Sequence, residues 1–274
     1  MSTKIFQIPF STLDFKETLR VVEQFICSNR QHHIATPNPE FLLESLENPE
    51  FKKILQNTSL NTPDGTGILW AASVQEKVLN IKYKVLRSIL KYPIGVFYLI
   101  CIAIYPKANK KIIKSRITGT DLMAEIFKNF PDKKIFLLGA KEGIAEKAAL
   151  SLCHSCENRN LNHVKSFAGS PKESDEHEIL SKINKFSPDI LFVAFGSPNQ
   201  EIWINKNLSK MPSVKIAIGV GGAFDFWANE KKRAPKFFQK LGIEWLYRLF
   251  IEPKRWKRIF NAVFVFPWKF LKNL

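Results

Sequence analysis

Cysteine is scarce in this chain, with four residues among 274. So few thiols in a chain of this length do not form a disulfide framework, which indicates a reducing compartment. Cys153 and Cys156 form one C-x-x-C pair, but no second pair completes a zinc or redox site, so two thiols near a helix end are the simpler interpretation. The opening stretch MSTKIFQIPF lacks a basic region followed by a long apolar run, so we expect no signal peptide and a cytoplasmic location.

Two phosphate-binding motifs are also missing. No GxGxxG is present, because the glycine run that begins at Gly219 has Phe224 where the third glycine belongs, and no GxxxxGK[ST] occurs. Dinucleotide oxidoreductases and P-loop enzymes are therefore disfavoured.

Acidic residues are unevenly distributed in this basic chain, whose formal net charge is +16. Residues 77–116 contain ten Lys or Arg and no Asp or Glu, and residues 231–274 contain twelve Lys or Arg against only Glu244 and Glu252. These two segments hold more than the entire net charge, and the rest of the chain is nearly neutral. Patches of this kind bind nucleic acid, anionic lipid or phosphorylated substrates.

The pattern of apolar runs predicts an α/β fold. Short apolar runs at 133–140, 188–196 and 213–222 alternate with segments of helical periodicity, and strand–turn–helix patterns also surround TPNPEF and TPDGTG near the N-terminus. Continuous apolar runs of this length are typical of parallel strands buried on both faces. We predict a Rossmann-like parallel sheet with helices on both faces, spanning residues 1–240.

Small or polar residues follow several of the predicted strands. Ligands of open α/β sheets bind beyond the carboxyl ends of the strands, where helix N-termini offer free N–H groups to anions. At any single strand end, glycine and polar residues need no role beyond turning the chain. Five such strand ends together favour a phosphate-bearing ligand. The residues at these strand ends are Thr36, Asn38, Asp64, Gly139, Ala140, Gly196, Ser197, Gln200, Gly219, Gly221 and Gly222.

Residues 78–112 interrupt the α/β pattern. Their apolar core, Ile94 to Tyr105, lies between Pro93 and Pro106 and is too short to cross about 30 Å of hydrocarbon as a helix. It is either a buried core element or an amphipathic or re-entrant element at a membrane face. The absence of acidic flanking residues favours the membrane face.

The last segment, residues 241–274, combines three tryptophans with a cluster of arginines and lysines. Indole rings beside cationic side chains are typical of a bilayer–water interface, whereas a basic nucleic-acid arm rarely carries so much Phe, Val and Ile. We therefore predict a basic, aromatic-rich C-terminal helical appendage that contacts an anionic membrane surface and no nucleic acid.

Seven blocks of sequence occur in order over nearly the whole chain: TPNPEFL, PDGTGI, RITGTDL, FLLGAKEGIA, VAFGSPNQE, IGVGGAFDFWANEKKRAP and EWLYRLFIEPKRWKR. With these blocks the chain resembles the WecG/TagA/CpsF family of bacterial glycosyltransferases. The family normally has far fewer residues between Asp64 and Arg116, so the 78–112 segment is an insertion relative to it, and Asn199 and Asn229 are smaller departures.

The resemblance implies transfer of a sugar, N-acetylmannosamine or a related hexose, from a UDP-sugar to a polyprenyl-diphosphate-linked sugar in surface-polysaccharide or teichoic-acid synthesis. It implies an inverting enzyme bound peripherally to the inner face of the cell membrane. Asp64 matches the family's proposed base position, although a plain turn aspartate is the alternative. Thr36 and Asn38 orient hydroxyl groups of a substrate or cap the following helix.

The donor and acceptor sites follow from the same resemblance. No two of the seven aspartates form a D-x-D pair, so we expect no metal and no cofactor, with helix N-termini and basic side chains stabilising the leaving UDP. Residues assigned to the donor are Gly139, Ala140, Gly196, Ser197, Gly219 and Gly221 through their backbone, and Gln200, Glu201 and Asp225 through their side chains. Residues assigned to the acceptor diphosphate are Arg116, Arg233, Arg248, Arg255 and Arg258.

Two alternatives stay open at this point. Spacings of seven and three place Arg248, Arg255 and Arg258 on one helical face if the helix continues through Pro253, and a solvated basic face is the other interpretation. A non-catalytic basic α/β module that binds anionic lipid or RNA would not need Asp64, whereas an enzyme would. Another donor, such as a UDP-hexose or a UDP-hexosaminuronic acid, and a homo-oligomer are compatible with the sequence.

Overall fold

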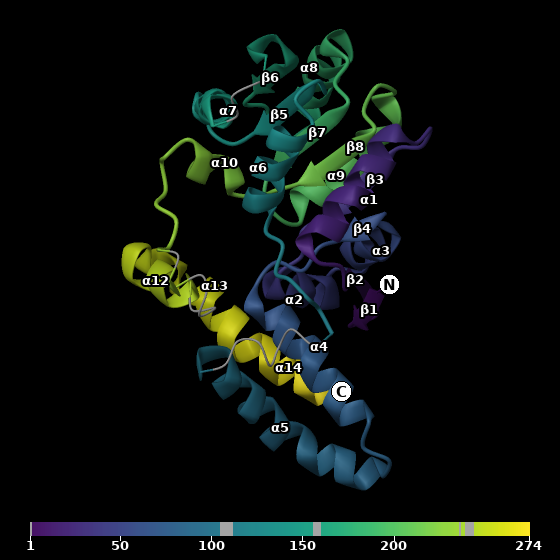
Figure 1. Ribbon diagram of the computed structural model, residues 1–274, viewed down its shortest axis with the longest axis vertical. Coiled ribbons are helices and arrows are strands. Elements are labelled where there is room, and N and C mark those ends of the chain that lie inside the picture. The colour runs from purple at the N-terminus through teal and green to yellow at the C-terminus, as the bar shows by residue number, and fades with distance from the viewer. Residues whose placement is uncertain (1, 105–111, 156–159, 236, 239–243) are drawn as a thin grey trace.

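The computed structural model describes residues 2–104, 112–155, 160–235, 237–238 and 244–274, with the backbone alone at 102–104. Its centre is a six-stranded sheet in which every pair of neighbours is parallel (Figure 1). This confirms the predicted Rossmann-like fold. The strands, in sheet order, are β4 (Leu60–Asn61), β3 (His32–Ala35), β8 (Ile216–Gly219), β7 (Ile190–Ala194), β5 (Ile135–Gly139) and β6 (Val164–Phe167).

The apolar runs form strands because both faces of the sheet are covered by helices. Along β5, Ile135 and Leu137 pack on one face, and Phe136 and Leu138 pack on the other. Helices α1 (Phe15–Cys27), α6 (Gly119–Asn129) and α7 (Ile144–His154) contribute to the first face, and α8 (Glu173–Phe186) and α9 (Asn199–Asn207) to the second. The short helix α10 (Ala223–Trp227) follows β8.

A second core lies at the opposite end of the molecule and is built mainly of helices (Figure 1). Trp70 is fully buried within it, and its rings lie 6.2 Å from Phe266 and 5.4 Å from Phe270. Its elements are the hairpin strands β1 (Ser2–Ile5) and β2 (Ile8–Ser11) and the helices α2 (Pro39–Glu47), α3 (Pro49–Asn57), α4 (Thr66–Leu79), α5 (Lys84–Ile104) and α14 (Phe266–Asn273).

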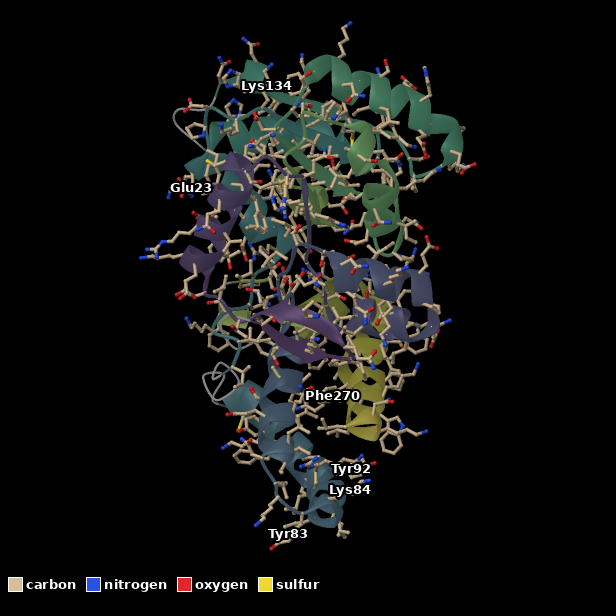
Figure 2. All side chains as sticks on the ribbon, turned by 90° about the vertical axis from the view of Figure 1, so that its right-hand side faces the viewer. Glu23, Tyr83, Lys84, Tyr92, Lys134 and Phe270 are labelled. Atoms are coloured by element: carbon tan, nitrogen blue, oxygen red, sulfur yellow. The ribbon has the colours of Figure 1, made fainter. Side chains whose placement is uncertain are left out.

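The helix α5 differs from the sequence expectation in where it begins. Pro93 lies inside the helix and does not bound it. Most of its large apolar side chains are exposed, so it is not a buried core element (Figure 2 labels Tyr83, Lys84 and Tyr92 at this end of the molecule). Within the described residues, no helix combines the length and apolar character that crossing a membrane requires.

The C-terminal segment is helical, as predicted, but broken. Helix α12 (Glu244–Ile251) ends before a 3₁₀ turn at Pro253–Arg255, so the continuous helix through Pro253 is wrong; proline removes a helical hydrogen bond and clashes with the preceding turn. Helix α13 (Trp256–Phe260), a π-helical turn (Asn261–Val265) and α14 complete the chain. The domain division at residue 240 stays a prediction, although Phe266 and Phe270 of α14 lie in the same core cluster as Trp70.

Candidate active site

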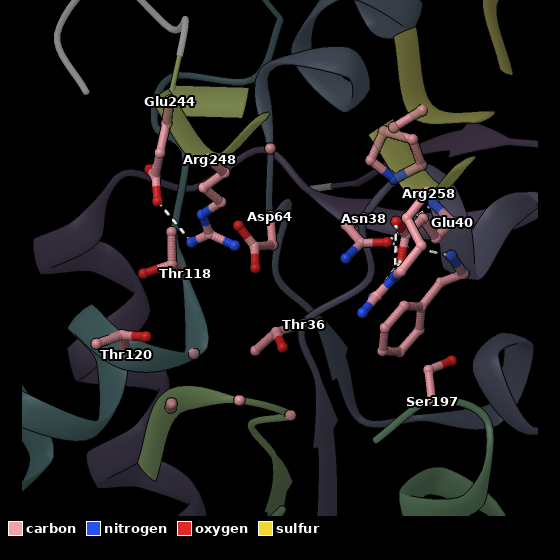
Figure 3. Close-up of a pocket in the computed structure, with 18 of the residues that line it drawn as sticks. Thr36, Asn38, Glu40, Asp64, Thr118, Thr120, Ser197, Glu244, Arg248 and Arg258 are labelled. Carbon is pink, nitrogen blue, oxygen red and sulfur yellow. Dashed lines mark hydrogen bonds and ion pairs between the residues drawn. The ribbon is translucent and has the colours of Figure 1, made fainter. Parts of the chain in front are cut away.

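A pocket of about 600 Å³ lies beyond the carboxyl ends of β3, β4, β7 and β8, and residues of α12 and α13 form its other wall (Figure 3). It brings together many predicted site residues that are far apart in sequence. These are Thr36, Asn38, Asp64, Arg116, Gly196, Ser197, Gln200, Gly221, Gly222, Arg233, Arg248, Arg255 and Arg258.

Five predicted residues lie outside the lining of this pocket, namely Gly139, Ala140, Glu201, Gly219 and Asp225. Gly139 ends β5 and Ala140 follows it, and this strand is separated from β8 by β7 in the sheet. Asp225 accepts a hydrogen bond from the ammonium group of Lys231, which does line the pocket. The assignment of these five residues to the donor stays a prediction.

Asp64 lies where the polypeptide leaves β4. Its backbone N–H donates to the carbonyl of Pro37 at 3.0 Å, and Gly65 follows in the left-handed region (φ 99°), which a residue with a Cβ rarely adopts. The carboxyl group therefore points into the pocket from a fixed turn, beside Arg248 (Figure 3).

The surroundings of Asp64 perturb its acidity. Desolvation by the protein raises its pKa to about 6, against the lowering effect of Arg116 and Arg248, while Glu244 and Asp121 raise it further. A carboxyl group with a pKa near neutrality is suited to accept a proton during catalysis, because it is ionised at neutral pH yet basic enough to take a proton.

Thr36, Gln200 and Glu201 together fix the loop after β8. The Thr36 hydroxyl donates to the carbonyl of Gly219 at 3.1 Å, and the Gln200 side-chain carbonyl accepts from the N–H of Gly221 at 2.9 Å. The Gln200 amide in turn donates to Glu201 at 2.8 Å. A Cβ at Gly219 would collide with both side chains, so only glycine fits at that position.

Glu201 is fully buried. Among the residues that the structure describes, its carboxyl oxygen Oε2 has no hydrogen-bond partner, and desolvation raises its pKa to about 8. Glu201 is therefore protonated at neutral pH and supports Gln200, which itself reaches the pocket.

Asn38 has the capping role that the sequence left as its alternative. Its side-chain oxygen accepts from the N–H groups of Glu40 at 2.9 Å and Phe41 at 3.2 Å, at the start of α2. Asn38 also lines the pocket, so capping α2 does not exclude contact with a ligand.

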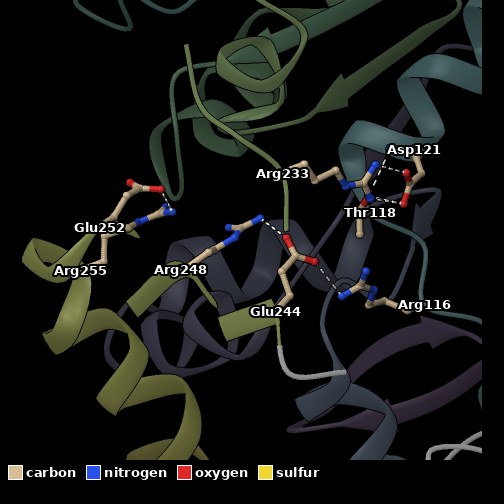
Figure 4. Close-up of polar contacts among 8 residues, drawn as sticks. All are labelled: Arg116, Thr118, Asp121, Arg233, Glu244, Arg248, Glu252 and Arg255. Carbon is tan, nitrogen blue, oxygen red and sulfur yellow. Dashed lines mark hydrogen bonds and ion pairs between the residues drawn. The ribbon is translucent and has the colours of Figure 1, made fainter. Parts of the chain in front are cut away.

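Each pocket arginine is held by a carboxylate (Figures 3 and 4). Glu244 accepts from Arg116 at 3.2 Å and from Arg248 at 2.6 Å, and its own pKa is lowered despite the opposing effect of burial, because the two guanidinium groups favour its charged form. Three further pairs share this arrangement: Arg233 with Asp121, Arg255 with Glu252, and Arg258 with Glu40.

The carboxylate partners were missed by sequence reasoning, although all four lie inside the quoted blocks. Glu40 belongs to TPNPEFL, Asp121 to RITGTDL, and both Glu244 and Glu252 to EWLYRLFIEPKRWKR. Three of the contacts join residues that are far apart in sequence, such as Arg116 and Glu244 at 128 positions, and no local pattern reveals them. The pairs Glu244–Arg248 and Glu252–Arg255 are spaced four and three residues apart, so helical spacing could have indicated them. Lys231, Thr118 and Phe226 also line the pocket without having been predicted.

The pocket thus combines a carboxyl group of raised pKa, that of Asp64, with five guanidinium groups. Guanidinium forks match phosphate oxygens in geometry and charge, so the arginine wall is suited to a diphosphate. Among the residues that the structure describes, no group of three or more His, Cys, Asp or Glu is placed to hold a metal ion.

The chain is similar to known proteins over most of its length. The chain is 28% identical to an N-acetylglucosaminyldiphosphoundecaprenol N-acetyl-β-D-mannosaminyltransferase of Bacillus spizizenii over 92% of this chain and 86% of that protein. It is 27% identical to the Staphylococcus aureus protein of the same name over 98% of this chain and 91% of that protein. The model of the WecG/TagA/CpsF glycosyl transferase family matches residues 3–92 and 93–274. The chain belongs to the WecG/TagA/CpsF family of glycosyl transferases.

Proposed function

We propose that this glycosyltransferase moves N-acetylmannosamine, or a related hexose, from a UDP-sugar to a polyprenyl-diphosphate-linked sugar. The observation that carries the proposal is the position of Asp64 in a pocket that five arginines also line. A base and a diphosphate-binding wall in one pocket are what transfer to a lipid-diphosphate acceptor requires. The names of the two relatives, which act on N-acetylglucosaminyldiphosphoundecaprenol, support the acceptor class.

The proposed reaction is a single displacement. Asp64 takes the proton of the acceptor hydroxyl, whose oxygen forms a bond to the anomeric carbon as the bond from that carbon to the UDP oxygen breaks. UDP leaves with the bonding electron pair, and attack from the opposite side inverts the anomeric centre. The pKa of Asp64, about 6, suits this role because the carboxylate form predominates at neutral pH.

The two substrates are proposed to occupy different parts of the pocket. The donor diphosphate lies against the backbone of Gly196 and Ser197, which follow β7, because N–H groups at strand ends bind anions without a metal. The N–H of Gly221 is already bound to Gln200, so Gly221 contributes close approach of the backbone and not a donor. The acceptor diphosphate lies against the arginines of α12 and α13. Lys231, which lies between Gly221 and Arg248 in the sequence, also lines the pocket and adds positive charge to it.

We also propose that the enzyme works without a metal ion, bound peripherally to the cytosolic face of the membrane. The cationic charge that a metal would supply to leaving UDP is available from Lys231 and the arginines of the pocket. A lipid-linked acceptor requires the protein to meet the bilayer, and the basic C-terminal segment carries the charge to do so.

The test is transfer by the purified full chain with UDP-N-acetylmannosamine and a short-chain lipid-diphosphate N-acetylglucosamine acceptor, measured as UDP release and as product mass. Asp64→Asn should lower kcat by about 10²–10⁴-fold, the usual contribution of a general base. Asp132→Asn, at an exposed aspartate, is the matched control and should leave kcat unchanged.

One result would count against the mechanism, and another would change only the donor. Near-native turnover by Asp64→Asn would remove Asp64 from the mechanism. Turnover with a UDP-hexose or a UDP-hexosaminuronic acid, and none with UDP-N-acetylmannosamine, would keep the reaction class and change the donor.

A further inference from the structure

The outer face of α5 is apolar although it is exposed. At about 100° per residue, its exposed apolar side chains cover roughly half of the helix circumference, where a surface helix of a globular protein carries polar residues. Exposed fractions reach 74% at Val85 and 62% at Ile89. We call this face the α5 outer face, and it consists of Val85, Ile89, Tyr92, Val96, Phe97 and Ile100.

The opposite face of α5 is firmly packed, so the orientation of the helix is fixed. The Trp70 indole N–H donates to the carbonyl of Gly95 at 3.0 Å, and a Cβ at Gly95 would press against the side chain of Leu271. Tyr98 is buried in the same core cluster. The apolar face therefore stays exposed while the rest of the helix is held against α4 and α14.

A second row of exposed aromatic residues extends this surface from the C-terminal end of the chain. Phe260, Phe264 and Trp268 are spaced four residues apart and are 49%, 61% and 62% exposed. The ring of Trp268 lies 6.2 Å from that of Tyr92, so the row joins the α5 outer face. Contiguous apolar patches of this extent on a protein surface mark sites of interaction with a partner or a membrane.

The charges around this surface indicate the partner. Exposed lysines flank it at Lys82, Lys84, Lys257 and Lys272, and the sequence has no acidic residue from 77 to 116. Lysines around exposed aromatic and aliphatic side chains complement an anionic bilayer, in which the apolar groups enter the acyl region and the ammonium groups meet the headgroups.

We propose that the α5 outer face, with Phe260, Phe264 and Trp268, docks on an anionic phospholipid bilayer and lies in its interface without crossing it. The proposal rests on the proposed function, because docking serves the enzyme only if its acceptor is linked to a lipid of the bilayer. The helical segment that carries Phe260 and Phe264 also contributes to the pocket, through Arg258, Ile259 and Ala262. Docking therefore places the arginine wall near the level of the lipid headgroups.

The test is co-sedimentation of the full chain with vesicles of phosphatidylcholine and phosphatidylglycerol. The double variant Ile89→Glu/Val96→Glu places two carboxylates on the α5 outer face, and we expect a loss of binding of at least about tenfold, because apolar burial and charge attraction both weaken. The matched control is Leu150→Glu/Leu161→Glu, at residues exposed to 47% and 51%, which should bind vesicles as the unchanged chain does.

Circular dichroism, thermal unfolding and transfer to a short-chain soluble acceptor accompany the binding assay, and they should be the same for the double variant and the unchanged chain. Vesicle binding that survives Ile89→Glu/Val96→Glu in a folded protein would overturn the proposal. A dimer in sedimentation equilibrium without lipid, lost in the double variant while vesicle binding persists, would assign the face to a second copy. If the double variant loses vesicle binding and neither protein transfers sugar, the docking surface stands and the proposed function fails.

Discussion

Replacing Glu244 with glutamine should move the acidic limb of the pH–rate profile to lower pH. In the unchanged chain, the pKa of Asp64 is raised from 3.8 to about 6, a shift worth about 3 kcal/mol against its charged form. Burial is the main cause, Arg116 and Arg248 oppose it, and Glu244 adds to it. Glu244→Gln removes the carboxylate that contacts both arginines, so their positive charge acts on Asp64 with less compensation.

The direction and size of the change follow from this balance. One unit of charge removed from a pocket wall changes the energy of a neighbouring charge by on the order of 1 kcal/mol, which corresponds to a pKa decrease of roughly 0.5–1 unit. For the unchanged chain, kcat/KM should fall about tenfold per pH unit below about pH 6, since the active form is the carboxylate. The variant should keep a larger share of its own maximal rate at low pH.

The measurement is kcat/KM from UDP release between about pH 5 and pH 8, with each profile scaled to its own plateau, because Glu244 also positions Arg116 and Arg248. Glu230→Gln is the control, since Glu230 is an exposed partner of Lys147 outside the pocket. An inflection in Glu244→Gln at the same pH as in the unchanged chain, or at higher pH, would refute the proposed electrostatic coupling to Asp64.

Three further results are expected. Activity should persist in excess EDTA, measured as UDP release; complete loss that Mg²⁺ or Mn²⁺ restores would reveal a metal requirement. Glu201 has a folded-state pKa of about 8 against 4.5, so the stability from its bound proton is present below pH 4.5 and lost as pH rises to about 8. Between these pH values, the free energy of unfolding of Glu201→Gln, measured with denaturant, should rise relative to that of the unchanged chain by up to about 1.4 kcal/mol per pH unit. If both proteins have the same pH dependence of unfolding free energy, Glu201 is not a buried neutral acid. Phe266→Ala should cost about 3–5 kcal/mol of unfolding free energy because Phe266 is fully buried, whereas Phe264→Ala, at a 61% exposed residue, should cost little. A cost for Phe266→Ala as small as that for Phe264→Ala would show that the C-terminal helix is not part of the core.

Much of the sheet could be predicted because its strands are buried on both faces. The apolar runs that form β5, β7 and β8 have no polar residue at a buried position, and the pattern is therefore unambiguous. The edge strand β6, with sequence VKSF, has one buried side chain and gives no such signal. The hairpin β1–β2 turns at Phe6 and Gln7, both at positive φ, where the expected turn residues are glycine and asparagine.

The site was predictable to the extent that it depends on strand ends. Asp64, Thr36, Gly221 and Gly196 follow β4, β3, β8 and β7, which are consecutive in the sheet, and they line one pocket. Gly139 gives the same sequence signal but ends β5, which the sheet places farther from β3 and β4. The order of strands across a sheet depends on how the connections cross, and a single sequence does not contain that order in readable form.

The C-terminal segment shows why composition alone does not separate an appendage from a core. Its arginines and aromatic residues indicated a ligand wall and a membrane face, but the same run of helix also has an inner side at Phe266 and Phe270 that completes the packing around Trp70. Arg258 lies only eight positions before Phe266, so deleting the segment would remove the proposed acceptor contacts and core packing together. Its proposed role in acceptor binding can therefore be separated from its role in stability only by single substitutions, which is why the charged and the buried positions need to be varied independently.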